Sequence, residues 1–384
     1  MASNVCVISG LSLAHTHGTG GQLLRFFEGA KVPFFHLYFT SFKYGKSECD
    51  NSYRLEDPYY WKFYRGRRFL IRLARRLKLS WWDEHNNVRP NKIQNLLKSN
   101  QLQADVVYAV VVSEDEAQRA NSLIKYLNCP YVVHFMDLLH QEGLDPATMP
   151  GLRQLLCHAS SVLVISEAMK REMLKFGISN ITVIPPGQTV SEYVAEFPNV
   201  NQKIRLATIG SVHPAGLELL AAAWPELVTR NPRLELLYAG IMQEDFPSTL
   251  KQALHYQGYI SDKHEYQKFL ASCHLAYMTG PPSLDCFGLF SVPSRLPDFF
   301  MAGLPVVACP VPGSATEGFL TVHDPAFVKL ALTPAQVVQG VESFISSSER
   351  WQQASQQAHT FATQQLSIDI IRQTVFDKLS EAIG

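Results

Sequence analysis

The sequence predicts an α/β fold built from two doubly wound parallel sheets, one in each half of the chain. The 384 residues suit two domains of ordinary size better than one. Short apolar runs alternate with helical patterns, as in parallel sheets that helices cover on both faces. The alternation stops over the polar stretch 187–203 and restarts at Ile204, so the second half repeats the architecture of the first.

The expected elements follow from these apolar runs. In the first half the expected strands are Val5–Ser9, Pro33–Phe39, Asp105–Val112, Tyr131–Phe135, Ser161–Ile165 and Ile181–Ile184. In the second half they are Ile204–Ile209, Leu234–Ala239, Leu254–Gln257, His274–Thr279 and Pro305–Cys309. Helices are expected between them, for example Asp115–Leu127 and Glu167–Phe176. The predicted domains are residues 1–190 and 191–366, followed by a terminal helix in 367–384 that can pack back on the first domain.

The composition is that of a globular protein. The chain is 46% hydrophobic and 18% charged, and its formal net charge of zero gives no global reason to expect nucleic acid as a partner. Seven scattered cysteines without a CxxC pair argue against a disulfide framework or a zinc site, and favour a reducing compartment. The start reads as a first strand instead of a signal peptide, and no apolar run has the length of a membrane span. We therefore expect a cytoplasmic protein, either soluble or peripheral to a membrane.

A glycine-rich stretch follows the first expected strand. It runs from Ser9 to Gly21 and precedes a helix expected to begin near Gln22. Glycines such as Gly20 and Gly21 let the backbone come close to a ligand, and the helix N-terminus then offers free N–H groups to a diphosphate or a sugar. The alternative is a tight turn without a ligand. The stretch is not the GxGxxG fingerprint of dinucleotide-binding domains.

Polar residues also mark the end of the strand Tyr131–Phe135. His134 lies within this strand, and Asp137 follows it. Both are candidate catalytic residues, because the carboxyl ends of parallel strands face the ligand site of such folds. The alternative for His134 is a satisfied core histidine.

The most informative segment runs from Pro281 to Pro312. Asp285 precedes a Phe-Gly turn, and Ser294 is placed to cap a helix whose first turn holds Arg295 and Asp298. An arginine at a helix start favours binding of an anion, and a carboxylate one turn later can accept hydrogen bonds from ribose or sugar hydroxyls. The alternative is a capped helix with an internal ion pair.

Taken in order along the chain, these motifs resemble those of the family 4 glycosyltransferases, which have the GT-B fold of two facing Rossmann-like domains and retain anomeric configuration. The resemblance is carried by Gly20-Gly21, by Pro130–Leu138, by Val162–Lys170 with Val183–Gly187, by the strands entering Gly210 and Gly240, by Gln257–Ile260, and by Asp285–Gly288 with Pro293–Asp298 and Ala302–Val307.

The resemblance assigns roles to matching positions. Asp285 takes the place of the first acid of the family's pair, near the donor sugar, and is therefore a candidate catalytic residue. Asp298 takes the place of the second acid, which binds ribose. Arg295 fits a basic position near the donor diphosphate. The remaining donor-binding positions that it implies are Gly210, Ser211, Tyr259, Phe287, Gly288, Leu289 and Ser294.

The sequence also departs from the family pattern. Both acids are Asp where the family prefers Glu, and the spacing between them is longer than usual. The basic pair that usually follows the first strand of the second domain is missing, since His213 is the basic residue there. Met136 stands where the family has a histidine, and Pro186 replaces a common Asn.

The resemblance implies a metal-independent, hexosyltransferase-like enzyme of polysaccharide or glycan biosynthesis. It would transfer a sugar, with retention, from a nucleotide sugar to a saccharide or lipid-linked acceptor. A UDP- or GDP-sugar is the expected co-substrate, with no further cofactor and no metal site. Two alternatives stay open: a GT-B nucleotide-sugar epimerase, which needs no acceptor, and a catalytically weak GT-B subunit that binds a partner.

The strongest local charge asymmetry lies in residues 59–82. Arginines and lysines interleave there with leucines and aromatic residues at helical spacing, and no acid occurs from Lys62 to Lys78. This pattern is typical of a helix that lies on an anionic membrane surface, which would suit a lipid-linked acceptor on the inner face of the cell membrane. The alternative is a surface helix with a solvated basic face.

Overall fold

The structure is a computed structural model that divides into two compact units. The first comprises Met1–Ile165, Met169–Ile184 and Arg372–Gly384, and the second Ser166–Ala168 and Pro185–Ile371. The structure describes the chain except for residues 1–3, 11–12, 14–17, 31, 39–46, 56–89, 138–148, 176, 211–213, 243–245, 281–285 and 323–325. The basic stretch 59–82 therefore lies outside the described residues, as do Asp285 and Ser211.

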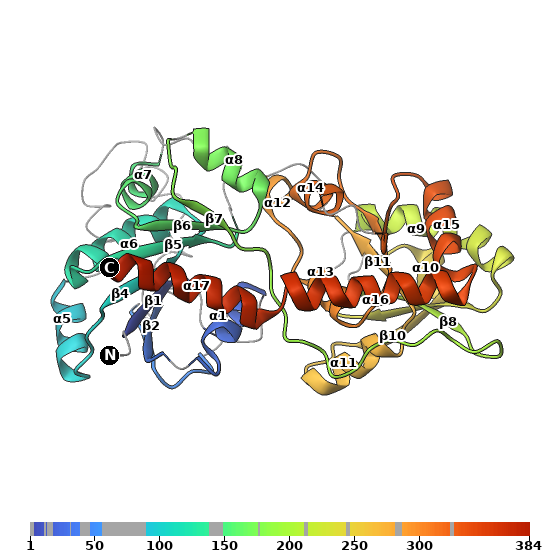
Figure 1. The fold of residues 1–384 in the computed structure, drawn as a ribbon, viewed down its shortest axis with the longest axis horizontal. Helices are drawn as coiled ribbons and strands as arrows, with labels where there is room; N and C mark the ends of the chain where they lie inside the picture. The colour runs from blue at the N-terminus through green and yellow to red at the C-terminus, as the bar shows by residue number, and fades with distance from the viewer. Residues whose placement is uncertain are drawn as a thin grey trace. The chain divides into compact units, whose positions relative to one another are not determined.

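The first unit is built on a seven-stranded parallel sheet (Figure 1). Its strands are β1 (Val5–Ser9), β2 (Phe34–Tyr38), β3 (Ser52–Arg54), β4 (Val106–Val110), β5 (Tyr131–Phe135), β6 (Ser161–Val164) and β7 (Ile181–Val183), in the order β3-β2-β1-β4-β5-β6-β7. Its helices are α1 (Gly18–Phe27), α5 (Pro90–Ser99), α6 (Glu114–Leu127) and α7 (Pro150–Cys157), together with α8 (Glu167–Lys175) and α17 (Ile368–Ile383) except for their first residues, which belong to the second unit. Strands β1, β4 and β5 are buried along their whole length, because helices cover both faces of the sheet.

The second unit repeats this plan with a six-stranded parallel sheet. Its strands are β8 (Ile204–Ile209), β9 (Leu234–Ala239), β10 (Leu254–Gly258), β11 (Leu275–Thr279), β12 (Val306–Cys309) and β13 (Val328–Leu330), in the order β10-β9-β8-β11-β12-β13. Its helices are α9 (Pro214–Arg230), α10 (Ser248–Ala253), α11 (Lys263–Ala271), α12 (Cys286–Phe290), α13 (Arg295–Met301), α14 (Ala315–Val322), α15 (Pro334–Ile345) and α16 (Ser348–Gln365). The predicted α/β fold class is thus confirmed.

Each sheet has one point where the strand order reverses. In the first unit it lies between β1 and β4, and in the second between β8 and β11. In open α/β sheets, ligands bind outside the carboxyl ends of the strands at such a point. The two reversal points are therefore the places to look for a site in each unit.

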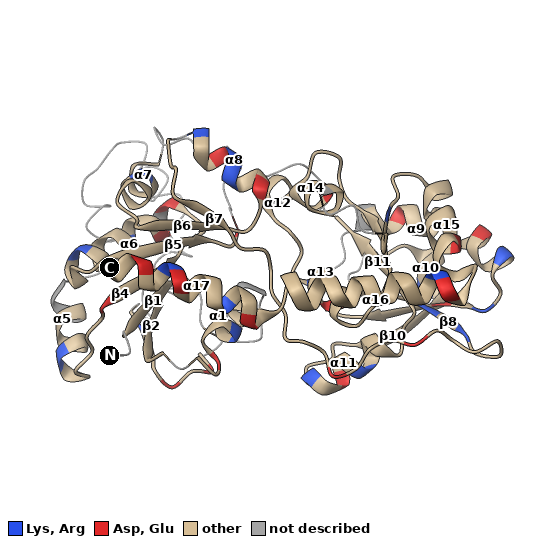
Figure 2. Cartoon of the chain, in the orientation of Figure 1, with Lys and Arg blue, Asp and Glu red and all other residues tan. Residues whose placement is uncertain are grey.

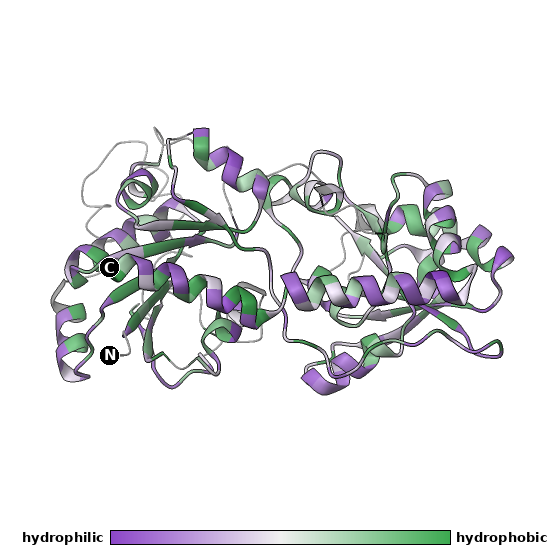
Figure 3. Ribbon diagram, viewed as in Figure 1, coloured by the Kyte–Doolittle hydropathy of each residue, from purple (hydrophilic) through white to green (hydrophobic). Residues whose placement is uncertain are grey.

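Hydropathy and charge follow the layers of the fold. The strands are the most hydrophobic elements, whereas the helices alternate hydrophobic and hydrophilic residues (Figure 3). Acidic and basic residues are interspersed along the outer elements of both units (Figure 2). Among the described residues, no helix combines the length and the apolar run needed to cross a bilayer.

The final turns of α17 belong to the first unit and pack on α1. The guanidinium of Arg372 donates hydrogen bonds to the backbone oxygens of Phe26, at 2.9 Å, and Arg25, at 2.7 Å. These carbonyls lie at the C-terminal end of α1, where a cation is favoured by the helix dipole. Phe376 adds an edge-on ring contact with Phe27, with ring centroids 5.9 Å apart.

Most expected strands agree with the structure to within two residues, and β1, β5, β8 and β9 agree at both ends. Two strands were not expected. Ser52–Arg54 and Val328–Leu330 are three-residue strands at the edges of the sheets, and each contains a charged residue. Such short edge strands are too polar to show an apolar run, so the sequence pattern misses them.

Candidate functional site

At the carboxyl edge of the second sheet, two glycines after the neighbouring strands β8 and β9 allow a close backbone approach. Gly210 follows β8 with φ +79°, and Gly240 follows β9 with φ +156°. A Cβ on Gly240 would overlap the backbone oxygen of Gly210, so a larger residue does not fit there. The hydroxyl of Tyr238 lies 2.7 Å from the backbone oxygens of both Gly210 and Ile241 and fixes this turn. Burial raises the pKa of Tyr238 to about 12, so its hydroxyl remains a donor.

Arg295 places a positive charge at this reversal point. It begins α13, and its guanidinium bridges the ends of two strands. One terminal nitrogen donates to the backbone oxygen of Ile209, at 3.3 Å, and the other to that of Thr279, at 2.6 Å. These residues end β8 and β11, the strands on either side of the reversal. These two carbonyl acceptors hold the side chain across the ends of the two strands.

The environment of Arg295 leaves that charge intact at neutral pH. Burial lowers the pKa of its guanidinium to about 10, while the nearby Tyr266 and Tyr238 act in the opposite direction. A guanidinium that is shielded from water and held at two strand ends is well suited to bind a phosphate or pyrophosphate. A Cβ added to Gly210 would lie 3.9 Å from the nearer guanidinium nitrogen, so these two predicted donor-binding residues are neighbours.

Asp298 lies one turn further along α13, and two side chains hold its carboxylate. Tyr266 of α11 donates a hydrogen bond to Oδ2 at 2.9 Å. The side-chain amide of Gln188 donates to Oδ1. Neither partner could be predicted from the sequence, because both are distant from Asp298 in the chain and belong to none of the motifs described above. The predicted ribose-binding acid is therefore oriented by residues of two other segments.

Ser294 precedes α13, but it does not cap it as expected. Its φ of −63° and ψ of −18° are already helical, and its side chain makes no capping hydrogen bond. A side chain that caps a helix usually starts from extended backbone, from which its oxygen can reach the N–H groups of the first turn. Ser294 is exposed in the structure.

The expected Phe-Gly turn is a short helix. Phe287, Gly288 and Leu289 lie within α12, which runs from Cys286 to Phe290. Gly288 is buried and Leu289 is half-buried. Two hydrogen bonds fix the end of this helix, from Ser166 to the backbone oxygen of Phe290, at 2.7 Å, and from Thr316 to that of Ser291.

Tyr259 follows β10 and is 63% exposed. The backbone at Gly258, just before it, has φ +74°, and the Gly258 oxygen accepts a hydrogen bond from the amide of Gly240. The predicted donor-binding residues Gly210, Tyr259 and Arg295 thus all lie at the carboxyl edge of one sheet, with Asp298 one helical turn from Arg295.

The other predicted site residues lie in the first unit. Gly20 and Gly21 are within α1, which begins at Gly18, four residues before the expected start at Gln22. The helix starts earlier because the glycines themselves adopt helical backbone. Both glycines are buried.

His134 is a core residue of the first unit. It is 1% exposed, its ring stacks at 6.2 Å on Phe26, and its Nδ1 is hydrogen-bonded to the hydroxyl of Tyr108. Burial lowers the pKa of His134 to about 3, so the ring is neutral at physiological pH. The geometry favours the core alternative over a catalytic role. Asp137 lies two residues beyond the end of β5 and is half-buried.

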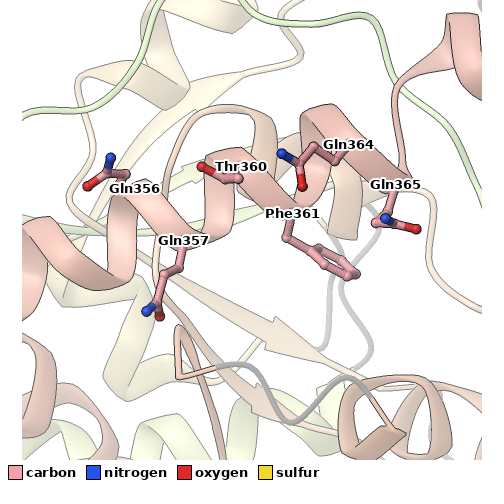
Figure 4. Close-up of a pocket in the computed structure, with 6 residues that line it drawn as sticks. All are labelled: Gln356, Gln357, Thr360, Phe361, Gln364 and Gln365. Carbon is pink, nitrogen blue, oxygen red and sulfur yellow. The ribbon is translucent and has the colours of Figure 1, made fainter.

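A shallow hollow of a different kind runs along α16. Figure 4 shows its lining residues, which are Gln356, Gln357, Thr360, Phe361, Gln364 and Gln365. All of them come from one helix, and their polar groups are neutral amides and a hydroxyl. A pyrophosphate needs concentrated positive charge, so the strand ends around Arg295 are the better candidate.

Among the described residues, no cluster of three or more His, Cys, Asp or Glu side chains could hold a metal ion.

Comparison with known proteins agrees with this architecture. Residues 39–191 match the sequence profile of the family named Glycosyltransferase Family 4. No curated protein sequence matched the chain. Among solved structures, HepE from Anabaena in complex with UDP-glucose is similar at a TM-score of 0.65 and 14% identity, over 98% of this chain and 99% of that one. Sucrose-phosphate synthase from Thermosynechococcus elongatus is similar at a TM-score of 0.65 and 12% identity, over 98% of both chains.

Proposed function

We propose that the chain is a glycosyltransferase that transfers a hexosyl group from a nucleotide sugar to a saccharide or lipid-linked acceptor. The match of residues 39–191 to the profile of Glycosyltransferase Family 4 and the likeness of the fold to GT-B enzymes support this proposal. Transfer proceeds with retention of anomeric configuration and serves glycan synthesis. A GT-B epimerase and a catalytically weak subunit would share this donor site, so an assay of sugar transfer to an acceptor is needed to distinguish them from a transferase.

The observation that carries this proposal is the position of Arg295. A sugar nucleotide reacts by breaking the bond between the sugar and a pyrophosphate, and negative charge grows on the departing oxygen. A cation held in advance at that position stabilises the transition state more than the ground state. Arg295 is held in this way, because the strand-end oxygens of Ile209 and Thr279 fix its guanidinium.

We propose a UDP-sugar as the donor. HepE, whose fold is similar, is described in complex with UDP and with UDP-glucose. In this chain Asp298 would accept hydrogen bonds from the ribose hydroxyls, and the backbone of Phe287–Leu289 would face the diphosphate or the sugar. The exposed ring of Tyr259 would contact the base.

The reaction would need no metal, since Arg295 supplies positive charge to the leaving group. Activity that is unchanged after EDTA treatment is the expected result, and loss of activity that Mn²⁺ restores would contradict it.

The acceptor would bind to the first domain, and a lipid-linked acceptor would suit the basic residues 59–82 if that segment contacts an anionic membrane. Co-sedimentation with anionic vesicles at low salt tests this membrane contact.

Titration calorimetry with UDP and uridine tests the donor site. We expect UDP to bind at least about 50-fold more tightly than uridine, because the charge-assisted contacts to the diphosphate carry most of the affinity. A coupled assay of UDP release from UDP-sugars, with and without saccharide acceptors, then tests transfer. Equal affinity for UDP and uridine, or no binding of either, would rule out the proposed site.

A further inference from the structure

Gln188 makes contacts that its position in an irregular segment does not suggest. It lies three residues after Pro185, where the main segment of the second unit begins. Its side-chain nitrogen donates to Oδ1 of Asp298, and its side-chain oxygen accepts a hydrogen bond from the amide of Thr189, at 2.8 Å. The second bond fixes which end of the amide faces the carboxylate.

The backbone of Gln188 is tied to a second segment. Its amide donates to the oxygen of Leu366 at 2.9 Å, and its own oxygen accepts from the amide of Ile368 at 2.8 Å. Leu366 and Ile368 come shortly before Ile371, where the chain leaves the second unit. Gln188 thus joins the two segments through which the chain enters and leaves that unit.

The packing beside Gln188 leaves little freedom for this junction. A Cβ on Gly187 would lie 2.8 Å from a methyl carbon of Ile371, a distance that real Cβ atoms essentially never show. The backbone therefore lies directly against the Ile371 side chain, and the Gln188 side chain is directed to Asp298 from a fixed base.

The carboxylate of Asp298 is held from both sides. Gln188 bonds to one oxygen, and the hydroxyl of Tyr266 bonds to the other at 2.9 Å. Together the two hydrogen bonds fix the plane of the carboxylate.

We propose that Gln188 is a positioning residue of the donor site, which orients Asp298 toward the ribose hydroxyls and links nucleotide occupancy to the two segments that enter and leave the second unit. The inference rests on the proposed function, because it takes the nucleoside diphosphate as the ligand. Gln188 acts through Asp298 and does not touch the nucleotide.

The test compares UDP with 2′,3′-dideoxy-UDP, which lacks both ribose hydroxyls, by titration calorimetry. The wild type should prefer UDP by about tenfold, the usual effect of hydrogen bonds to a charged group. Gln188→Ala should weaken the binding of UDP by about fivefold and leave the affinity for 2′,3′-dideoxy-UDP unchanged, because the substitution disturbs only the contact to the ribose hydroxyls. Tyr266→Phe, which removes a single hydroxyl, should give the same pattern and serves if Gln188→Ala does not fold.

Two controls separate positioning from stability. Gln373→Ala removes an exposed glutamine that bonds to Asp377 at 2.7 Å on α17, and it should leave both affinities unchanged. In an Asp298→Asn background, Gln188→Ala should have no further effect on UDP, since the two residues act as one unit.

The outcomes distinguish this inference from the proposed function. If the wild type binds UDP but Gln188→Ala has no effect, or weakens both ligands equally, the inference is overturned and the donor site stands. If the wild type does not bind UDP, the proposed function fails and the inference fails with it.

Discussion

The two sheets share one topology, yet their reversal points hold side chains of opposite charge. In the second unit, Arg295 bridges the ends of β8 and β11 through their carbonyl oxygens. In the first unit, the carboxylate of Glu116 covers Gly10 after β1 and accepts a hydrogen bond from the amide of Val112, after β4, at 2.9 Å. An α/β reversal point is a place for a ligand, but the charge held there decides which ligand it can take. We therefore expect a pyrophosphate to bind at the reversal point of the second unit.

The largest effect is expected from removing the cation of the second unit. Arg295→Ala should weaken UDP binding by about 100-fold, the usual size of losing a charge-assisted contact to phosphate. Arg295→Lys keeps the charge, but one ammonium cannot reproduce the rigid fork that bridges two strand ends, so it should recover only part of the affinity. Calorimetry with UDP measures both effects.

Arg295→Ala also leaves the oxygens of Ile209 and Thr279 without this donor, so thermal melting must show that the variant is folded. If folded Arg295→Ala binds UDP as tightly as the wild type does, the difference in charge between the two reversal points does not determine donor affinity.

The two units also differ in what surrounds a glycine at a strand end, and this difference affects stability. Gly240 has φ +156° and faces the backbone of Gly210, whereas the neighbour that a Cβ on Gly10 would meet is the flexible end of Glu116. Backbone cannot move aside as a side chain can. Gly240→Ala should therefore lower the free energy of unfolding by about 3 kcal/mol, and Gly10→Ala by about 1 kcal/mol, as the Glu116 hydrogen bond is lost.

Thermal melting of the two variants measures this difference. Equal destabilisation would indicate that Glu116 is held as rigidly as backbone.

The sequence predicts the framework of the donor site but not its internal contacts. Chain order and the apolar runs place β8 and β11, and the motif around Arg295 is local, so both can be read from neighbouring residues. The partners of Asp298 cannot, because Gln188 lies 110 residues away and its bond to the carboxylate arises only on folding. His134 shows a different limit. In a strand buried on both faces, the apolar pattern has no period, so it does not tell whether a polar residue faces the core or the site.

The stability of the two units should also depend differently on pH. The first unit buries two histidines, His36 and His134, and burial lowers the pKa of each from 6.5 to about 3. The second unit holds His274, whose pKa is lowered to about 4 by burial and by Arg205 and Arg233. Below pH 6.5 the unfolded chain takes up protons that these folded histidines do not, so stability falls as the pH falls toward 3 or 4.

As the pH falls, the first unit should therefore lose stability more steeply than the second. Hydrogen exchange of each unit between about pH 7 and about pH 4.5 would measure this. His134→Asn, which can keep the bond to Tyr108, should flatten the dependence in the first unit only. An unchanged slope in that variant would show that other groups dominate the acid response.

The smallest expected effect is at the reversal point of the first unit. Glu116 lies in the first turn of α6, where its amide also donates to the N-cap side chain of Ser113 at 3.3 Å, so its local role is that of a capping residue. Glu116→Gln should keep UDP affinity within about twofold and lower stability by about 0.5 kcal/mol, as the charge-assisted bond to Val112 becomes a neutral one. Calorimetry and melting on one sample measure both. The contrary result would be UDP binding that is about tenfold tighter in Glu116→Gln. It would indicate that the Glu116 carboxylate repels the bound diphosphate, so that the charge at the first reversal point also affects donor affinity.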